Sequence, residues 1–368
     1  MVLSDVKQAD GGEGHTVALK KDGSVWTAGW AYGGALGDGT SGNRFLPKLN
    51  FVKVIDAGVK YVTAGRHSTY AIKTDGSLWA VGHNSDGQLG DGTKTSKVQF
   101  TKVIDSGVVG VNSCFYTTYA VKADGSLWAT GKNSVGQLGD GTTTDRLKYV
   151  KLIDGDVIDV QTGSYWAMVL KRDGSVWTMG SNYYGQRGGG PRSGGWNGPG
   201  TKTFAKVISE GVKAISAGSY VAMAIKQDGS LWVAGNNRYG QLGDGKSGSN
   251  VMSTTFKKVV DSGVKEATSG YLHSALLNDK GELCVTGNNA GYGMLGTGDT
   301  TNVVGFDKKC FPRPGGCNDN NGGCHSKRAC TVEAGSVKCG DCPADLTNDG
   351  PKGCKATSAC MCVRACVG

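Results

Sequence analysis

Short apolar runs separated by Gly-rich turns recur along most of the chain. Two such runs, at residues 71–74 and 78–81, flank the pair Asp75-Gly76. Because Asp-Gly tolerates the positive φ of a tight turn, this pattern predicts two antiparallel strands joined as a hairpin. The chain has no stretch of 18 apolar residues, so we expect no membrane span.

The hairpin pattern is repeated at a regular interval. Asp-Gly-Ser, then Val or Leu, then Trp begins at Asp22, Asp75, Asp124, Asp173 and Asp228. A sixth, degenerate copy spans residues 280–284, so successive copies lie 53, 49, 49, 55 and 52 residues apart. Each hairpin follows a Val-rich segment (as at 58–65) and precedes Gly-Gln-Leu-Gly-Asp-Gly (as at 87–92) and a Phe-x-Lys-Val-Ile segment (as at 100–104). Four short strands in about 50 residues are typical of a propeller blade.

Residues 75–90, which read Asp-Gly-Ser-Leu-Trp and then Gly-x-Asn-x-x-Gly-Gln-Leu-Gly, resemble the regulator of chromosome condensation repeat. The resemblance extends over residues 5–310 and implies an all-β propeller. The founding member of that family has seven blades. Here six units are present, and segments 6–12 and 306–310 can serve as complementary end strands, so we expect six four-stranded blades, with a lost or degenerate seventh as the alternative. The recurring Trp side chains are expected to be buried between adjacent sheets.

Composition agrees with an all-β chain and does not indicate a nucleic-acid partner. Gly contributes 62 residues and Pro only 7, without a three-residue period, so the glycines are expected in turns. The net charge of +9 is spread thinly, and no run of five Lys or Arg occurs.

Cysteines divide the chain into two unequal parts. Ten of the 12 lie between Cys310 and Cys366, which predicts a propeller at 1–309 and a small disulfide-rich module at 310–368. So short a segment cannot bury enough apolar surface alone, so disulfides in an oxidising compartment are expected, with zinc as the alternative. This favours the extracellular space or the secretory lumen. Residues 1–9 lack the apolar segment of a signal peptide, so we expect a mature or trimmed form.

The spacing from Cys317 to Cys354, with Cys339-x2-Cys342 inside it, resembles an epidermal growth factor module of the thrombospondin-like type. The resemblance implies the disulfides Cys317–Cys330, Cys324–Cys339 and Cys342–Cys354. No carboxylate lies in residues 311–316, where the calcium motif of such modules would stand, so we expect no cofactor. Cys114 replaces a strand-ending Gly and Cys284 replaces a Trp; both are expected to be buried free thiols, with a Cys284–Cys310 disulfide as the alternative.

The sequence carries no enzyme signature. His15 and His273 fall at equivalent positions near a strand end, which indicates a structural role, and the Gly-rich loops lack the Lys-Ser/Thr of a P-loop. We therefore expect no catalytic residue and no metal site.

Aromatic residues before each Gly-Gln-Leu-Gly segment are the best candidates for partner contact, because aromatics on a rigid scaffold bury large areas at little entropic cost. The candidates are Trp30, Tyr32, Tyr183, Tyr184, Tyr239 and Tyr292, together with Arg192 and Trp196 in the Gly/Pro-rich insertion at 188–200. Packing between blades could account for several of them, and a disordered surface insertion is the alternative for 188–200.

Three functions fit these patterns. The first is a non-enzymatic extracellular adhesion, matrix or filament component that binds a protein or glycan partner. A guanine-nucleotide exchange factor or chromatin-associated propeller is the second, by family analogy alone, and the cysteine segment argues against it. The third is a secreted enzyme inhibitor, because one bacterial β-lactamase-inhibiting propeller resembles the same repeat.

Overall fold

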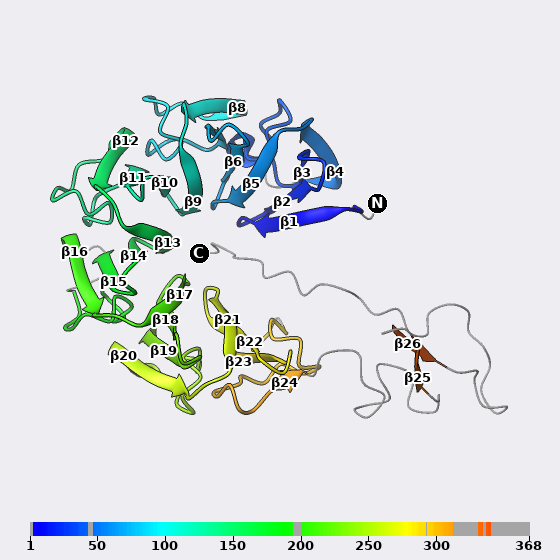
Figure 1. The fold of residues 1–368 in the computed structure, drawn as a ribbon, viewed down its shortest axis with the longest axis vertical. Coiled ribbons are helices and arrows are strands. Elements are labelled where there is room, and N and C mark those ends of the chain that lie inside the picture. The colour runs from blue at the N-terminus through cyan, green and yellow to red at the C-terminus, as the bar shows by residue number, and fades with distance from the viewer. Residues whose placement is uncertain are drawn as a thin grey trace.

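A computed structural model describes residues 3–42, 47–193, 200–291, 293–311, 330–333 and 336–339. These residues form six four-stranded antiparallel sheets, arranged as blades around a central axis, and a separate two-stranded sheet (Figure 1). The prediction of an all-β propeller with six four-stranded blades is confirmed. In the described ranges the only helix is one 3-10 turn, η1 (Tyr32–Gly34).

Every blade is built from four strands that are consecutive in sequence. The blades comprise β1 (Val6–Gly11), β2 (His15–Lys20), β3 (Val25–Gly29) and β4 (Lys48–Ile55); β5 (Val59–Ala64), β6 (Ser68–Lys73), β7 (Leu78–Gly82) and β8 (Lys97–Ile104); β9 (Val108–Cys114), β10 (Thr117–Lys122), β11 (Leu127–Gly131) and β12 (Arg146–Ile153); β13 (Val157–Gly163), β14 (Trp166–Lys171), β15 (Val176–Gly180) and β16 (Thr201–Ile208); β17 (Val212–Ala217), β18 (Val221–Lys226), β19 (Leu231–Asn236) and β20 (Met252–Val260); β21 (Val264–Ser269), β22 (His273–Asn278), β23 (Leu283–Gly287) and β24 (Cys310–Phe311). The two-stranded sheet pairs β25 (Cys330–Glu333) with β26 (Ser336–Cys339), Cys330 opposite Cys339.

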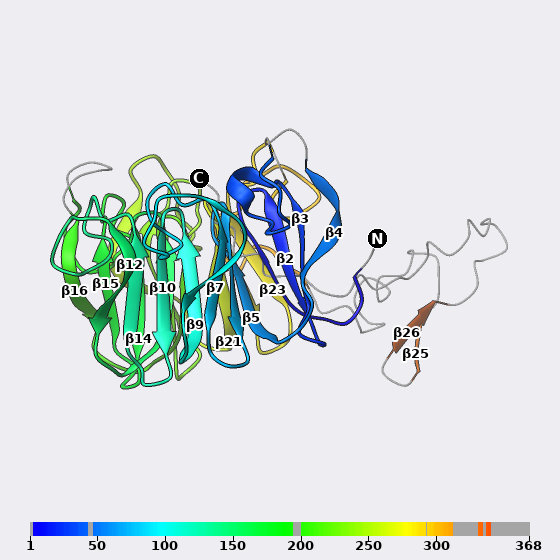
Figure 2. The same cartoon turned by 90° about the horizontal axis from the view of Figure 1, so that it is seen from above.

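Strands run between two ends of the ring, which carry different connections (Figure 2). One end, here termed the loop face, holds the short turns between the first and second strands and the Gly-rich loops between the third and fourth. The opposite end, the hairpin face, holds the Asp-Gly hairpins. There Gly76 has a φ of 80°, which glycine adopts more readily than residues with a side chain. Surface function can therefore differ between the two ends.

The core lies between blades, where each sheet covers the face of the next. In blade 2, Tyr70, Ile72 and Leu78 are fully buried and pack against Val108 and Val111 of blade 3. Equivalent clusters of Val, Leu, Ile and Met fill the following interfaces. Burying such a side chain contributes about 1.5–3 kcal/mol, so the packed interfaces stabilise the ring strongly.

The recurring Trp side chains are partly buried, and two of them, Trp177 and Trp232, pack against the core clusters between blades, so the expected burial between sheets holds in part. They are half-buried near the hairpin face. Trp79 Nε1 donates to Ser77 Oγ at 2.9 Å, and Lys73 Nζ lies 4.0 Å from the ring centroid. The same Trp–Ser hydrogen bond recurs at Trp26, Trp128, Trp177 and Trp232. These residues close the hairpin, while other side chains, Tyr70, Tyr119 and Trp166 among them, are fully buried in the interfaces.

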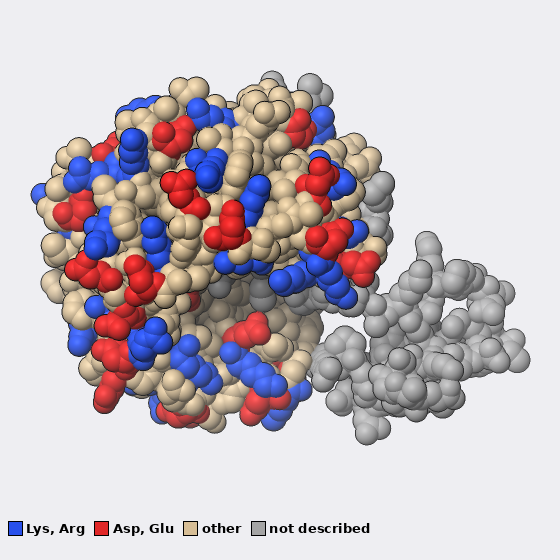
Figure 3. All heavy atoms as spheres, turned by 45° about the horizontal axis from the view of Figure 1, so that its top comes forward, with Lys and Arg blue, Asp and Glu red and all other residues tan. Residues whose placement is uncertain are grey.

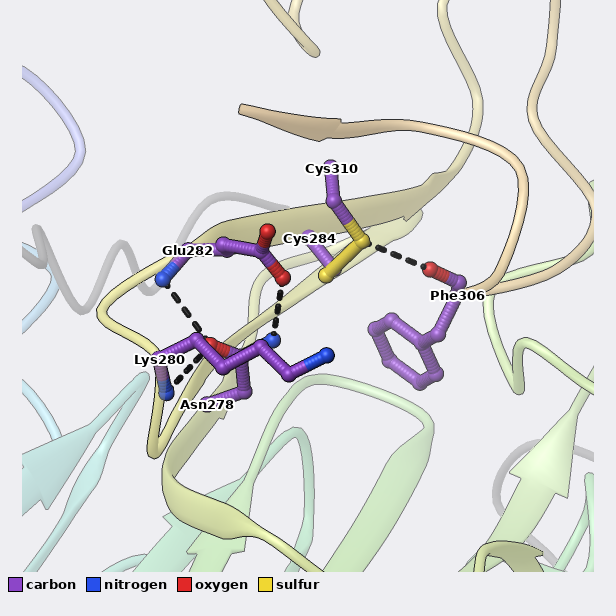
Figure 4. The surroundings of a disulfide bond; sticks show 6 residues. All are labelled: Asn278, Lys280, Glu282, Cys284, Phe306 and Cys310. Atoms are coloured by element: carbon purple, nitrogen blue, oxygen red, sulfur yellow. Dashed lines mark hydrogen bonds between the residues drawn. A yellow bond between two sulfur atoms is a disulfide. The ribbon is translucent and has the colours of Figure 1, made fainter. Parts of the chain in front are cut away.

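Blade 6 replaces the Trp by a disulfide. Cys284 and Cys310 face each other on β23 and β24 and are bonded (Figure 4). In blade 2 the equivalent cross-strand pair is Trp79 and Lys102. The expectation of a free thiol at Cys284 is therefore wrong, and the alternative pairing with Cys310 is confirmed. Cys114 is also disulfide-bonded, so a free thiol there is wrong as well.

The degenerate hairpin of blade 6 is closed by its own strand. Asn278 Oδ1 accepts the amide N–H groups of Lys280 and Glu282, at 3.1 and 2.9 Å (Figure 4). In the other copies the turn Asp accepts from the Ser two residues on. An amide side chain on β22 thus supplies the acceptor that the missing Asp would have provided.

Blade 6 packs less tightly than the other blades. The first strand of each blade contacts the first strand of the next blade, from β1 through to β21. Among the described residues, β21 and β1 lack a comparable strand-to-strand contact, and their ribbons stand apart in Figure 1. A cavity of about 270 Å³ lies beside β21, lined by Ala267 and Ala275. Val62 and Tyr70 occupy these positions in blade 2. Small residues thus leave the last blade underpacked. The two end segments expected as strands lie where the repeats placed them, in β1 of the first blade and β24 of the last.

Within the described ranges the structure contains no helix of the length and apolarity that a bilayer span requires. The described ring includes Cys310 and Phe311, which form β24, and most of the residues after Phe311 lie outside what the structure describes.

Leu127→Ala should destabilise the ring more than Trp128→Ala, although the residues are neighbours. Leu127 is fully buried and should lose about 2–5 kcal/mol of unfolding free energy, whereas the half-buried Trp128 should lose about 1–2 kcal/mol. Urea unfolding of both variants measures the difference. An equal or larger loss at Trp128 would contradict the assignment of the core.

Candidate functional site

The loops of the loop face are held by buried asparagines. Asn84 is fully buried; its Nδ2 donates to Asp91 Oδ1 and to the carbonyl of Thr93, both at 3.0 Å, and its Oδ1 accepts the amide of Leu89 at 3.0 Å. Asn133, Asn182, Asn237 and Asn289 are equally buried and brace their loops in the same way. Because each amide is satisfied by its own loop, the loops have fixed shapes.

A Gln in the Gly-rich loops of blades 2 to 5 fixes the segment before it. Gln137 Oε1 accepts the amide of Val135 at 3.0 Å, and Gln186 Oε1 accepts the amide of Tyr184 at 2.8 Å. Blade 1 lacks the bracing amide, since Ala31 stands in its place, and there the chain forms η1 instead. The residues between the Asn and the Gln are therefore presented on a rigid support.

Ring contacts join aromatic side chains of the loop face across neighbouring blades. Tyr32 lies 4.8 Å from His67 and 5.8 Å from His83, centroid to centroid, and Phe115 lies 6.0 Å from Tyr116. We term the whole set the aromatic belt: Tyr32, His67, His83, Phe115, Tyr116, Tyr165, Tyr183, Tyr184, Tyr220 and Tyr271. The belt draws on blades 1 to 6, so the contacts between blades exist only in the assembled ring.

Charged side chains are built into one part of the belt. Arg66 pairs with Glu13 of blade 1 and donates from Nη1 to the hydroxyl of Tyr116 at 2.9 Å. Its guanidinium also lies 4.8 Å from the Phe115 ring centroid. Glu13 receives a second contact from His67 Nε2 at 3.1 Å. Three blades are thus tied together by one partly buried arginine.

A second part of the belt is formed by tyrosines. Tyr184 lies 4.7 Å from both Tyr183 and Tyr220, and Tyr220 lies 5.4 Å from Tyr271. Arg192 Nε donates to the Tyr183 carbonyl at 2.7 Å, and its guanidinium lies 5.0 Å from that ring centroid. Burial raises the pKa of Tyr220 far above its usual value, so its hydroxyl stays protonated and can donate a hydrogen bond.

Two aromatic members have backbones in the left-handed region. Phe115 has φ of 54° and Tyr165 has φ of 60°, and both stand in the turn between the first and second strands of a blade. Bulky residues rarely adopt this conformation, which costs on the order of 1–3 kcal/mol. Gly or Asn would be favoured there if the turn served folding alone. The two rings are therefore held at the loop face against a local preference.

The structure brings several sequence-predicted residues into the belt and leaves others apart. Tyr32, Tyr183 and Tyr184 are members, and Arg192 contacts it. Trp30 packs against Gly14 of the neighbouring turn, and Tyr239 lies 5.4 Å from the Arg238 guanidinium, away from the ring contacts of the belt. Trp196 and Tyr292 lie outside the described residues. Partner contact by any of these side chains stays a prediction.

Sequence reasoning missed His83 and the six belt residues that come from the turns between the first and second strands of blades 2 to 6. Tyr116, Tyr165 and Tyr220 each directly precede the second strand of their blades, and His67 holds the same place in blade 2. An alignment of the repeats on that strand would have shown three tyrosines at one position. The sequence therefore carries a signal for this part of the belt.

The predicted structural role of His15 is confirmed. It begins β2, is buried, and places Nε2 2.9 Å from Thr69 Oγ1 of blade 2. Burial, with a further effect of His67, lowers the pKa of His15 to about 4. His273 begins β22, and burial lowers its pKa too. In the described residues no group of three or more His, Cys, Asp or Glu is arranged to hold a metal ion.

Comparison with known proteins identifies the repeat in part of the ring. Residues 59–88, 157–186 and 212–241 match the family model of the Regulator of chromosome condensation (RCC1) repeat. Each match covers the first three strands of a blade and the start of its Gly-rich loop. The described part of the chain is thus an RCC1-like propeller.

Similar curated proteins are much longer than the matched segment. The Mus musculus protein named Probable E3 ubiquitin-protein ligase HERC4 is 33% identical over 87 residues, which are 23% of this chain and 8% of that protein. E3 ubiquitin-protein ligase MYCBP2 of Danio rerio is 37% identical over 76 residues, which are 21% of this chain and 2% of that protein. The chain matches less than a tenth of each relative's length.

Solved structures share the fold over most of the chain. Prp20p of Saccharomyces cerevisiae gives a TM-score of 0.70 at 18% identity, covering 82% of this chain and 76% of that one. Human WBSCR16 gives 0.70 at 20% identity, covering 86% and 84%. At these identities the similarity establishes the fold alone.

Stability should fall on mild acidification, and His15 should cause part of the fall. Because its folded pKa of about 4 lies below the ordinary 6.5, the unfolded chain takes up the proton first. The contribution of His15 to the free energy of unfolding is therefore complete above pH 6.5 and is lost as the pH falls toward 4. The loss should be on the order of 2 kcal/mol by pH 4.5. Urea unfolding of wild type and His15→Gln at pH 7.5 and 4.5 measures this. Identical pH dependence in both proteins would exclude the mechanism.

Proposed function

We propose that this protein is a non-enzymatic binding protein of the extracellular space or secretory lumen, whose aromatic belt contacts a protein or glycan partner. The observation that carries the proposal is the pair of aromatic residues, Phe115 and Tyr165, held at positive φ on the loop face. Local strain of this kind clusters at ligand sites, where the gain on binding offsets its cost.

The composition of the belt supports partner contact. Tyr and Arg are enriched in the residues that dominate binding energy, because they combine large apolar area with hydrogen-bonding groups. Phe115, Tyr116 and Tyr165 are half-buried, so part of each ring remains accessible. The buried Asn and Gln residues fix the surrounding loops, which reduces the entropy lost on association.

Charge distribution favours a protein or glycan over nucleic acid. On the face drawn in Figure 3, Lys and Arg alternate with Asp and Glu, and no large area carries one sign. Ion pairs between the two kinds occur repeatedly, as in Lys102–Asp105 and Lys151–Asp154. A surface that binds phosphate backbones concentrates positive charge instead.

The compartment is inferred from the cysteines. The Cys284–Cys310 disulfide and the bonded Cys114 fit an oxidising environment, as does the cysteine-rich segment after residue 310. Cytosolic thiols are kept reduced, so a chain with this framework would lose it there. The resemblance of residues 317–354 to an epidermal growth factor module points the same way, although its disulfides lie outside the described residues.

Phe115→Asn with Tyr165→Asn should weaken partner binding without unfolding the ring. Asn tolerates positive φ, so the change removes the rings and relieves strain together. Calorimetric titration with a partner purified from the native source should show at least a tenfold weaker Kd, about 1.4 kcal/mol. Trp79→Ala, on the hairpin face, is the control and should leave Kd unchanged. An unaltered Kd in the folded double variant would refute the belt as the contact surface.

Nucleotide exchange provides the test of the main alternative. The Prp20p structure was described together with its binding to Gsp1p and histones, and this chain shares its fold at 18% identity. Fold similarity alone is weak support for exchange activity. We expect micromolar protein to leave GDP release from a panel of labelled small GTPases unchanged. Strong acceleration would favour the exchange-factor hypothesis over the proposed function.

A further inference from the structure

We infer that the groove between blades 2 and 3, on the outer side of the ring, binds an acidic oligosaccharide, a chain of pyranose rings that carries carboxylate or sulfate groups. This blade 2–3 groove has a volume of about 620 Å³ and follows β8, the outer strand of blade 2 (Figure 1). None of the residues that line it belongs to the aromatic belt. The site is therefore a second one, and it does not depend on the proposed function.

The blade 2–3 groove extends from one face of the ring to the other. Lys97, which begins β8, lies at its loop-face end, and Asp105, just after β8, lies at its hairpin-face end. At about 3.3 Å per strand residue, these ends are on the order of 25 Å apart. Near the loop face Asp91 forms a β-bridge with Lys148 of blade 3, and a Cβ atom at Gly92 would lie 2.8 Å from Lys148 Cε. The shape suits an extended chain better than a single sugar ring.

An aromatic ring and two cations stand on the blade 3 side of the groove. Trp128 is half-buried, Lys122 Nζ lies 4.7 Å from its ring centroid, and Lys148 is exposed on β12. The lysines of blade 2 pair with aspartates, as Lys102 does with Asp105 at 3.2 Å. Among the described residues Lys122 and Lys148 form no such ion pair. Two ammonium groups beside an indole ring are thus available to an anionic ligand.

These features match the chemistry of an acidic sugar chain. A pyranose ring presents a face of C–H groups that packs against an indole ring, and its carboxylate or sulfate oxygens accept hydrogen bonds from ammonium groups. The exposed carboxylate of Asp105 can accept hydrogen bonds from sugar hydroxyls. The groove is lined by four lysines and two aspartates, so its charge favours an anion.

An acidic peptide fits the groove less well, because the strands that border it are poor templates for an added strand. Register shifts interrupt the pairing of β8 with β7 and of β12 with β11. Lysines also stand along both outer strands. Bulges and lysines are typical of sheet edges that are protected from further pairing. A peptide would therefore find few main-chain partners here.

The groove between blades 5 and 6 provides a comparison within the same ring. It occupies the equivalent place and has a volume of about 720 Å³. The residues equivalent to Lys122, Trp128 and Lys148 are Asn278, Cys284 and Gly305. Its three lysines are matched by three aspartates. This blade 5–6 groove lacks the aromatic ring and the excess positive charge, so we expect it not to bind the acidic chain.

Fluorescence polarisation of a labelled oligouronate with the full chain tests the inference. We expect saturable binding that weakens as ionic strength rises, and binding about tenfold weaker once the carboxylates of the sugar are reduced to alcohols. A sulfated oligosaccharide of equal length distinguishes the two acids, since the tighter of the two ligands identifies the preferred group. Failure of both acidic sugars to bind, or equal binding of oligoglutamate, would overturn the inference.

Lys122→Gln with Lys148→Thr is the variant that locates the site, because blades 4 and 5 carry Thr203 and Thr255 at the position of Lys148. It should keep its far-ultraviolet spectrum and bind the oligouronate about tenfold more weakly. Lys258→Gln with Lys280→Gln, in the blade 5–6 groove, is the matched control and should bind like wild type. Unchanged binding in the first variant, or an equal loss in the second, would place the sugar elsewhere and refute the assignment.

The two proposed sites can be tested separately. Phe115→Asn with Tyr165→Asn, which removes two rings of the aromatic belt, should bind the oligouronate with wild-type affinity. If that variant loses oligouronate binding, the belt is the sugar site and the groove is not. If the belt fails to contact a native partner while Lys122→Gln with Lys148→Thr still weakens oligouronate binding, the proposed function is wrong and the groove assignment stands.

Discussion

Each blade of this ring has two apolar faces, and only neighbouring blades can bury them. Tyr70 and Leu78 of blade 2 are fully buried because blade 3 covers them, and no strand of blade 2 could do so. A single four-stranded sheet of this kind would leave both faces in water, so the units must assemble to be stable. The loop positions, the inner-strand contacts and the exposed edges all depend on that packing.

The same constraint explains why the last blade differs from the others. Among the described residues β21 and β1 lack the contact that joins other neighbouring inner strands, and Ala275 stands where blade 2 has Tyr70. With less apolar area to bury, blade 6 has less stabilisation from packing. A disulfide between its third and fourth strands, Cys284–Cys310, restricts the unfolded chain and offsets part of that loss. Cysteines thus stand where the repeat departs from its own pattern.

The loop face combines rigid loops with aromatic residues that are held in a strained backbone conformation. Fully buried amides such as Asn84 satisfy their hydrogen bonds inside their own loops, which leaves the outward side chains free to serve recognition. Phe115 and Tyr165 are held at positive φ between strands whose registers are fixed by ladders of hydrogen bonds. The strained backbone of these turns persists because the hydrogen-bonded strands on either side fix its conformation. A partner can therefore meet a preformed aromatic surface.

The sequence by itself determined the repeat, the number of blades, the Asp-Gly hairpins and the place of β2 at His15, because these depend on residues close together in the chain. It also marked Tyr32, Tyr183 and Tyr184 as loop residues. Tertiary structure decided what lies across blade boundaries. The Trp side chains are half-buried instead of fully buried, because their burial depends on which side chains the neighbouring sheet places against them. The contact of Arg66 with Glu13 and Tyr116 joins residues 53 and 50 positions apart, and no local pattern encodes it. Only closure of the blades on one another brings such residues together, because the distances between blades are fixed by packing.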